Sequence, residues 1–324
     1  MKKKVIKKVF EKSTWAIDII IAPFAAVSAI VLKFLRRGGI NRFPISKKVL
    51  LKIGVFPVRD HYYEPLFNPK HLKKPSSDER ILSGIDWNIN DQLALLKAFN
   101  FQHEFTNIAD EFLCDTEFHF RNGSYESGDA EYWYNIIRYK KPSRIIEIGS
   151  GNSTKIARLA ICMNKKLDST YQCEHICIEP YERPWLEKIE GIEVLRKKVE
   201  DIDICFFGQL NENDILFIDS SHIIRPQGDV LFEYLELMPT LKSGVIVHIH
   251  DIFSPRDYLR EWIADKILFW NEQYLLEAFL CFNSEWKIIG ALNFLCHHHF
   301  DLLKEKCPRL TPDREPGSFY IVKI

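Results

Sequence analysis

The chain from about residue 124 onwards alternates short apolar runs with amphipathic stretches, and this alternation constrains its fold more than any other feature. Runs rich in β-branched residues predict strands, whereas apolar residues spaced three or four apart predict helices. Strands that alternate with helices form a parallel sheet covered on both faces, so we expect a doubly wound α/β domain. The expected strands are 144–148, 175–179, 193–195, 214–219, 245–250, 286–290 and 318–322. The expected helices are 129–139, 154–163, 183–189, 229–241 and 270–282.

A glycine-rich loop follows the first of these strands, in the sequence RIIEIGSGNST over residues 144–154. Gly149 and Gly151 permit a tight turn and let the backbone approach a ligand closely. Ser153 or Thr154 can cap the next helix. Open α/β sheets bind ligands at the carboxyl ends of their strands, which is where this loop lies. We therefore expect the loop, Ser150 included, to surround a bound cofactor.

The residues of the loop indicate which cofactor it binds. A nicotinamide fingerprint requires a third small residue, G-x-G-x-x-G, and Thr154 stands in that place. Glu147, two residues before Gly149, would repel a pyrophosphate but would suit a ligand with an ammonium group. S-adenosylmethionine (SAM) has the ammonium group and no phosphates, so we expect SAM. The alternatives are a nicotinamide-dependent oxidoreductase and a glycine turn that binds nothing.

Glu179 ends the next expected strand, 28 residues after Gly151. An acidic side chain at this distance from the glycine loop typically binds ribose hydroxyls. We expect this role for Glu179, and the alternative is an ordinary solvated acid at the end of a strand.

Asp219 and His222 follow the strand expected at 214–219, in the sequence DILFIDSSH. They place two titratable groups at the mouth of the predicted crevice. The unperturbed pKa of histidine suits a general base near neutral pH, so we expect His222 to act as the base beside Asp219. The alternative is that His222 only caps the following helix.

His250 and Asp251 end the neighbouring strand, in the sequence VHIHD. If the two strands are adjacent, these residues converge with Asp219. Oxygen and imidazole ligands can hold a divalent cation, so magnesium or manganese at Asp219, His250 and Asp251 is one interpretation. A hydrogen-bonded polar cluster without metal is the other.

The paired motifs EIGSGNST and FIDSSH resemble those of the class I SAM-dependent methyltransferases, in particular a bacterial group, and the resemblance covers residues 128–324. It implies a Rossmann-like, seven-stranded sheet with a reversed last strand. It also implies SAM contacts from Glu147, Gly149, Gly151 and Glu179, with Glu200 or Asp201 near the adenine.

Metal-dependent O-methyltransferases of similar fold place a metal-binding aspartate where this chain has Asp219. They place a catalytic lysine at the position of His222, and an Asp-Asn pair at the position of His250 and Asp251. The resemblance implies methylation of a hydroxyl on a glycan or a small-molecule acceptor. The sequence shows neither the basic channel nor the base-flipping pocket that a nucleic-acid acceptor would require. A SAM-binding scaffold without catalytic activity is the alternative.

The first 44 residues differ from the rest of the chain. They carry ten Lys or Arg residues against Glu11 and Asp18, and the apolar run 15–32 is flanked by basic residues on both sides. We predict that segment 1–44 binds a membrane surface, followed by a substrate-side subdomain at 45–115 and the methyltransferase domain at 116–324. A signal peptide and a buried helix are the alternatives.

The membrane topology follows from the charges. SAM is a cytosolic cofactor, six lysines lie in the first twelve residues, and basic flanks stay on the cytoplasmic side. Pro23 interrupts the apolar run, and Asp18 is costly at the centre of a bilayer. We therefore expect a re-entrant hairpin or an interfacial helix on the cytoplasmic face of a membrane, not a straight span.

Overall fold

The computed structural model describes residues 2–181 and 183–324, with the side chains of residues 2–13 excluded. Two compact units are present, Met1–His71 and Leu72–Ile324. The second unit contains a seven-stranded sheet in the order β3-β2-β1-β4-β5-β7-β6. Its strands are β1 (Arg144–Ile148), β2 (Glu174–Ile178), β3 (Glu193–Leu195), β4 (Ile215–Ile218), β5 (Ile246–Ile249), β6 (Trp286–Ala291) and β7 (Phe319–Lys323).

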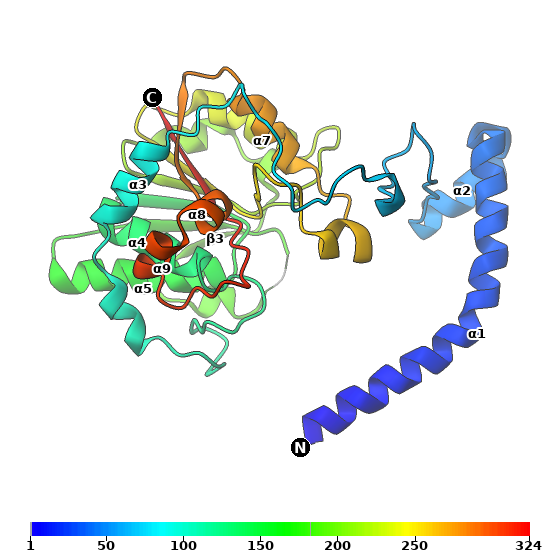
Figure 1. Cartoon of the computed structure of the whole chain (residues 1–324), viewed down its shortest axis with the longest axis horizontal. Helices are drawn as coiled ribbons and strands as arrows, with labels where there is room; N and C mark the ends of the chain where they lie inside the picture. Colours follow the sequence, from blue (N-terminus) through cyan, green and yellow to red (C-terminus); the bar gives the residue numbers. More distant parts are fainter. Residues whose placement is uncertain (1, 182) are drawn as a thin grey trace. The chain divides into compact units, whose positions relative to one another are not determined.

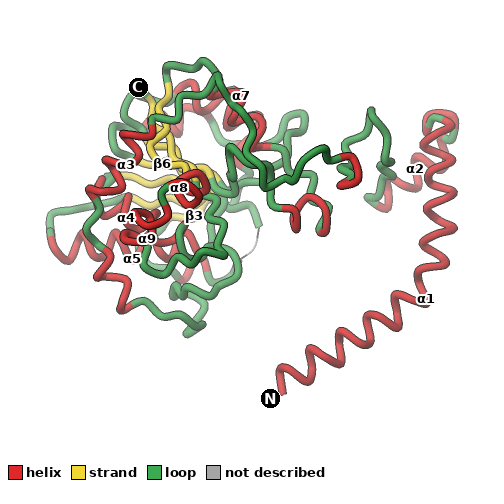
Figure 2. The backbone as a smooth tube through the Cα atoms, viewed as in Figure 1, coloured by secondary structure: helices red, strands yellow, loops and turns green. Residues whose placement is uncertain are grey.

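The sheet confirms the expected fold class. Strands β1 to β5 pair with one another in parallel, whereas β7 pairs antiparallel with both β5 and β6. The last strand is therefore reversed, as the resemblance implied. Figure 2 shows the strands side by side with helices packed around them.

Side chains alternate across the sheet and build a core on each face. Ile146, Ile148 and Leu216 face one core, whereas Ile145 and Phe217 face the other. The helices of this unit are α3 (Ile89–Ala98), α4 (Asp129–Lys140), α5 (Asn152–Leu167), α6 (Asp229–Leu231), α7 (Glu272–Leu280), α8 (Leu292–His298) and α9 (Phe300–Lys306). Burial on both faces makes the sheet rigid, and its carboxyl edge is left to carry the loops.

Two expected helices are not formed as predicted. Of 183–189, only Leu186–Lys188 forms a short 3₁₀ turn. The expected helix 229–241 divides into α6, a π-helical segment Phe232–Leu237 and a 3₁₀ turn Met238–Thr240. Pro239 lies in the last of these segments, where it cannot donate a backbone hydrogen bond.

The segment 72–115, part of the subdomain predicted at 45–115, belongs to the same compact unit as the sheet. The side chain of Gln92, on α3, accepts a hydrogen bond of 2.7 Å from the backbone of Ala291 at the end of β6. Glu104 pairs at 2.8 Å with the buried Arg138 of α4. These buried polar contacts fix the segment to the sheet domain.

The first unit contains α1 (Lys2–Gly38), a long bent helix (Figure 1), and α2 (Pro44–Ile53). The portion Thr14–Gly38 is long and apolar enough to cross a membrane, with a mean hydropathy of 2.2 over its most apolar window. Helix α1 continues through Pro23, so of the two forms that we expected, a re-entrant hairpin or an interfacial helix, the described structure contains a helix and not a hairpin. The lysine side chains within residues 2–12, on which the predicted topology depends, lie outside the described residues.

Candidate active site

The glycine loop brings the ends of β1 and β4 into close contact. Gly149 has φ +81°, and a Cβ atom built on it would lie 2.0 Å from the backbone oxygen of Asp219. Only glycine fits such an approach. The loop is braced by Thr154, whose Oγ1 accepts a hydrogen bond of 3.1 Å from the Gly151 backbone N–H and donates one to Glu147.

Glu147 does not lie where the sequence placed it. Its side chain is fully buried and contacts Thr154 together with the Nε2 of His175, 3.3 Å away. Side chains of a strand alternate between its two faces. Ile148 lines the larger of two cavities at the end of β1, so Glu147 points to the opposite face. Glu147 therefore supports the loop from behind instead of lining the cofactor cavity.

Two cavities adjoin the glycine loop. One, of about 280 Å³, is lined by the ends of β1, β2 and β4 and includes Glu179 and Glu200. The other, of about 140 Å³, includes His250 and the loop residues Ser150, Gly151 and Ser153. Both are lined by Gly149, Glu179, Arg183 and Asp219, so the cavities are adjacent. Thr154 and Asp201, which we expected at the cofactor, are not among the residues that line either one.

Glu179 is nearly buried at the end of β2. Its carboxylate accepts hydrogen bonds from the backbone N–H groups of Ser150, at 3.3 Å, and Tyr181, at 3.0 Å. These bonds join the end of β2 to the glycine loop and hold the carboxylate at the wall of both cavities. This is the position that we predicted for an acid that binds ribose hydroxyls.

Asp219, His222, His250 and Asp251 converge at the ends of β4 and β5. Asp219 Oδ1 lies 3.3 Å from His222 Nε2 and 3.5 Å from His250 Nδ1. Asp251 lies 3.5 Å from His222 Nε2 and 3.3 Å from His250 Nδ1. The expected convergence of Asp219, His250 and Asp251 is therefore present, and His222 joins them. Asp219 lines both cavities and His250 one of them, whereas His222 lies behind Asp219.

The backbone of the cluster is strained. His222 has φ +59° and Asp251 has φ +60°, a left-handed backbone conformation that residues other than glycine rarely adopt. Such conformations cost about 1–3 kcal/mol each and concentrate at functional sites. His222 does not cap the following helix, because α6 begins only at Asp229 with Gly228 as its cap.

Glu272 is a site residue whose contact with His222 the sequence did not reveal. It lies at the start of α7, is fully buried, and places a carboxylate oxygen 2.8 Å from His222 Nδ1. Tyr234 donates a hydrogen bond of 3.0 Å to its other oxygen. The ring of Trp270 packs on His222 at 4.3 Å. A carboxylate on Nδ1 fixes the orientation of the imidazole and keeps Nε2 directed at Asp219 and Asp251.

The carboxylates around the two histidines shift their pKa values. Burial lowers the pKa of His222, but hydrogen bonds to Asp219 and Glu272 and the charges of Glu272 and Asp251 outweigh it, so the pKa lies well above its ordinary value. For His250, burial is likewise outweighed by Asp251 and Asp219, which raise its pKa to about 10. Burial favours the neutral acid at Asp219, yet His222 and His250 hold the pKa of Asp219 below its usual range. The raised pKa of His250 favours its cationic form at neutral pH, and the pKa of His222 is shifted in the same direction, so the unperturbed pKa that suggested a base does not apply.

The cluster also has the composition of a cation site. One ligand atom of each of three residues, Asp219, His222 and Asp251, lies within 4.8 Å of the other two. The histidine of this group is His222, whereas the sequence predicted His250. Carboxylate oxygens with an imidazole suit a divalent metal such as manganese or magnesium. The bond from Glu272 to Nδ1 is of the kind that orients metal-bound histidines. These three side chains therefore offer ligand atoms that a divalent metal could use.

The open sheet with its reversed strand and a glycine loop at the carboxyl edge defines a domain of the class I methyltransferase kind. In agreement, residues 146–252 match a family described as "Methyltransferase domain". The chain is 30% identical over 174 residues to an uncharacterized protein of Archaeoglobus fulgidus, an alignment that covers 50% of this chain and 76% of that protein. The chain belongs to the same family as this archaeal protein.

Solved structures show more distant similarity. A putative methyltransferase from Thermobifida fusca has 11% identity and a TM-score of 0.37, covering 60% of this chain and 78% of that one. An O-methyltransferase from Bacillus cereus in complex with SAH has 10% identity and a TM-score of 0.36, covering 72% and 91%. A structure described as "cmcI-D160 Mg-SAM" has 14% identity and a TM-score of 0.35, covering 62% and 72%. Similarity at these TM-scores does not indicate which cofactor or substrate this chain binds.

Proposed function

We propose that the chain binds SAM and transfers its methyl group to a hydroxyl of a glycan or small-molecule acceptor. The observation that carries the proposal is the pair of adjacent cavities that share Gly149, Glu179 and Asp219. The larger cavity would hold the adenosine, with Glu179 at its ribose and Glu200 near the adenine. The smaller cavity, along the glycine loop, would hold the methionine portion.

In the proposed reaction the acceptor oxygen attacks the methyl carbon, and the carbon–sulfur bond breaks with its electron pair going to sulfur. SAM becomes the neutral thioether S-adenosylhomocysteine, and the hydroxyl proton must leave. Asp219 would contact the hydroxyl because it lines both cavities. The hydroxyl proton would pass to Asp219 and from there to the unprotonated form of His222, whose Nε2 lies 3.3 Å from Asp219. The positive sulfonium of bound SAM would oppose protonation of His222 before transfer, since like charges disfavour each other.

Calorimetric titration tests the cofactor. We expect SAM to bind the folded full-length chain, and NAD to show no binding. The variant Glu179→Gln should weaken SAM binding by roughly tenfold, because a charge-assisted hydrogen bond to the ribose is worth about 1.5–3 kcal/mol. Binding of NAD without SAM would favour the oxidoreductase alternative and overturn the proposal. Binding of SAM without methyl transfer into any metabolite extract would favour the non-catalytic scaffold.

A divalent metal is a second candidate ligand of the same cluster. Asp219, His222 and Asp251 would hold it, with Glu272 orienting His222. A magnesium or manganese ion would supply Lewis acidity to an acceptor hydroxyl. His222 would then be a ligand, not a proton acceptor, so the two roles are mutually exclusive.

We further propose that α1 attaches the protein to the cytoplasmic face of a membrane. Apolar side chains are exposed along this helix, among them Trp15, Ile20 and Phe24, at 67–72% exposure. Its C-terminal turn carries Arg37, which suits anionic headgroups, whereas Arg36 pairs with Glu64 at 2.8 Å. A helix that is apolar on all sides is typical of a lipid environment.

Truncation tests the attachment. Full-length protein should pellet with anionic vesicles, whereas a chain that begins at Leu72, the start of the compact sheet unit, should stay in the supernatant. Most of the bound fraction should be lost, since the shorter chain lacks α1 and its exposed apolar side chains. Equal pelleting of both proteins would contradict the proposal. Labelling of a cysteine added before Lys2 by an impermeant reagent in intact cells would contradict the cytoplasmic topology of the N-terminus.

A further inference from the structure

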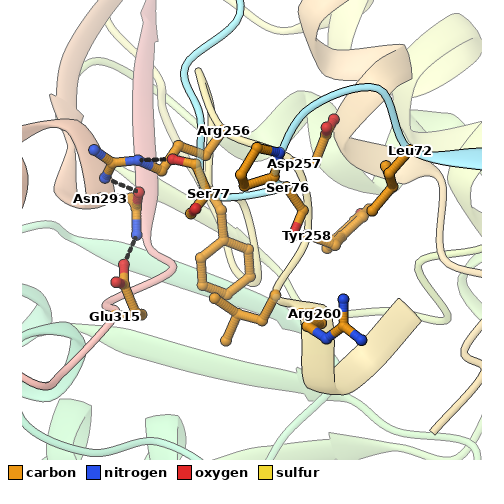
Figure 3. A pocket seen from close by; sticks show the side chains of 12 residues that line it. Leu72, Ser76, Ser77, Arg256, Asp257, Tyr258, Arg260, Asn293 and Glu315 are labelled. Carbon is orange, nitrogen blue, oxygen red and sulfur yellow. Dashed lines mark hydrogen bonds between the residues drawn. The ribbon is translucent and has the colours of Figure 1, made fainter. Parts of the chain in front are cut away.

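A third cavity, of about 200 Å³, lies at the same edge of the sheet as the site described above (Figure 3). Its residues come from the loop after β5, from segment 72–77, and from the chain next to β6 and β7. Ile249 at the end of β5 and Ala291 at the end of β6 are both paired with Phe319 at the start of β7. The cavity therefore belongs to the β5–β7–β6 half of the edge, whereas the larger cofactor cavity belongs to the β1–β2–β4 half.

The catalytic cluster lies between the two halves. Asp251 is only two residues before Phe253, a residue of the third cavity, so their Cα atoms are at most about 7 Å apart. The loop is held in place, because the backbone N–H of Phe253 donates a hydrogen bond of 2.7 Å to Gln273 of α7. A molecule in this cavity would therefore have its near end within reach of the cluster.

The walls combine apolar surface with polar groups that already have partners. Phe253, Tyr258, Leu72, Pro75 and Leu259 provide apolar and aromatic surface. Arg256 donates to the Ser77 carbonyl at 2.8 Å and pairs with Glu79, and Asp257 pairs with Arg80 at 3.0 Å. Glu315 accepts hydrogen bonds from Asn293, at 2.7 Å, and His297, at 2.8 Å. Figure 3 shows Arg256, Asn293 and Glu315 joined in one row of hydrogen bonds.

Arg260 is the exception. This exposed residue lines the cavity and, within the described part of the chain, has neither an ion pair nor a hydrogen-bond partner. Arg256 and Asp257 each pair with an oppositely charged neighbour, whereas the guanidinium of Arg260 has no such partner within the described residues and can therefore meet an anion in the cavity. A guanidinium is suited to a carboxylate or a phosphate, which it can bind through two parallel hydrogen bonds.

We infer that this cavity binds the methyl acceptor, and that the acceptor is a small ring compound with an anionic group. The ring would lie against Phe253 and Tyr258, and its carboxylate or phosphate would pair with Arg260. The inference rests on the proposed methyl transfer, because it takes the cavity to be the acceptor half of that site. Binding of a part of the acceptor remote from the reacting hydroxyl would position that hydroxyl at Asp219.

Tryptophan fluorescence of the full-length protein can report binding at this cavity. Trp262 packs on Phe253 at 5.2 Å, and Trp270 lies 6.1 Å from Tyr258. The anionic probes are glucuronate for a sugar ring and 4-hydroxybenzoate for an aromatic ring, with glucose and phenol as their neutral counterparts. We expect one anionic probe to give a saturable change with a Kd on the order of 1 mM, and its neutral counterpart to bind at least tenfold more weakly.

Substitutions of Arg260 test whether this side chain binds the anionic group of the probe. Arg260→Gln should weaken binding of the anionic probe by about tenfold or more, whereas Arg260→Lys should retain part of it. Lys266→Gln, which removes a positive charge from the same exposed segment, should leave probe binding unchanged. Arg260 lines neither cofactor cavity, so SAM affinity should be equal in all variants.

The outcomes separate the two proposals. Failure of the wild-type protein to bind SAM would contradict the proposed methyl transfer. The effect of the Arg260 variants on binding of the anionic probe could still be measured in that case. Normal SAM binding without a saturable response to either anionic probe would overturn the acceptor inference alone. Equal binding of charged and neutral probes, or equal loss in the Lys266→Gln variant, would also overturn it.

Discussion

Replacing His222 by glutamine is expected to lower the rate of methyl transfer by about 10²- to 10⁴-fold, the usual contribution of a general base. His222 Nε2 lies 3.3 Å from Asp219 and 3.5 Å from Asp251, so glutamine would remove the group that takes up the proton. The Kd for SAM should change little, because His222 lines neither cofactor cavity. The measurement is transfer of a labelled methyl group from SAM into a small-molecule extract, with SAM affinity measured separately. His103→Gln, at an exposed position with a side chain 73% accessible, is the control for loss of a histidine.

The pH dependence of the same rate tests the role of Glu272. A base is active only when it is unprotonated, and the pKa of His222 is raised well above its ordinary value. The rate should therefore increase with pH through the neutral range and level off only on the alkaline side. Glu272→Gln removes a negative charge that raises this pKa, so the increase should move to lower pH. A merely structural role for Glu272 would lower the rate at every pH and leave the position of the increase unchanged.

A chelator distinguishes proton uptake from metal binding at His222. If Asp219, His222 and Asp251 hold a metal, EDTA should abolish transfer and manganese or magnesium should restore it. If His222 takes up the proton, EDTA should have no effect and the loss in His222→Gln should persist at any metal concentration. Near-normal turnover in both His222→Gln and Asp219→Asn would contradict both roles.

Much of the fold could be predicted because its signals are local. The β-branched runs place β1 and β3 at the observed residues and the other strands within one or two residues of theirs. The convergence of Asp219, His250 and Asp251 was also predictable, since parallel strands end at one edge and β4 and β5 are neighbours. Pattern reasoning of this kind requires only the period of the strands and their order along the chain.

The features that were missed depend on side-chain direction and distant contacts. Glu272 contacts His222 across 50 residues of sequence, from the start of a helix whose position on the sheet has no local signal. Glu147 was assigned to the cofactor from its distance to Gly149, although alternation along β1 gives it the opposite face from Ile148. The raised pKa of His222 follows from three carboxylates that only the folded chain brings together.

The contact between the glycine loop and β4 predicts the second large effect. Gly149→Ala should reduce SAM affinity by at least about tenfold, equivalent to about 1.4 kcal/mol. The new Cβ would lie 2.0 Å from the backbone oxygen of Asp219, and neither backbone can yield without moving the end of β1 or β4. The positive φ of Gly149 adds about 1–2 kcal/mol of strain for alanine. Because Gly149 and Asp219 line both cofactor cavities, the displacement would alter the proposed binding site directly.

Calorimetry with SAM and thermal unfolding measure the two consequences of Gly149→Ala. The melting temperature should decrease, and SAM binding should remain weak at temperatures where the variant is still folded. Gly208→Ala is the matched control, since Gly208 is exposed and a Cβ there would meet no atom within 4 Å. That variant should retain both its stability and its SAM affinity. SAM affinity within about twofold of wild type in folded Gly149→Ala would show that the cofactor does not depend on the close approach of β1 and β4, because a twofold change is only about 0.4 kcal/mol.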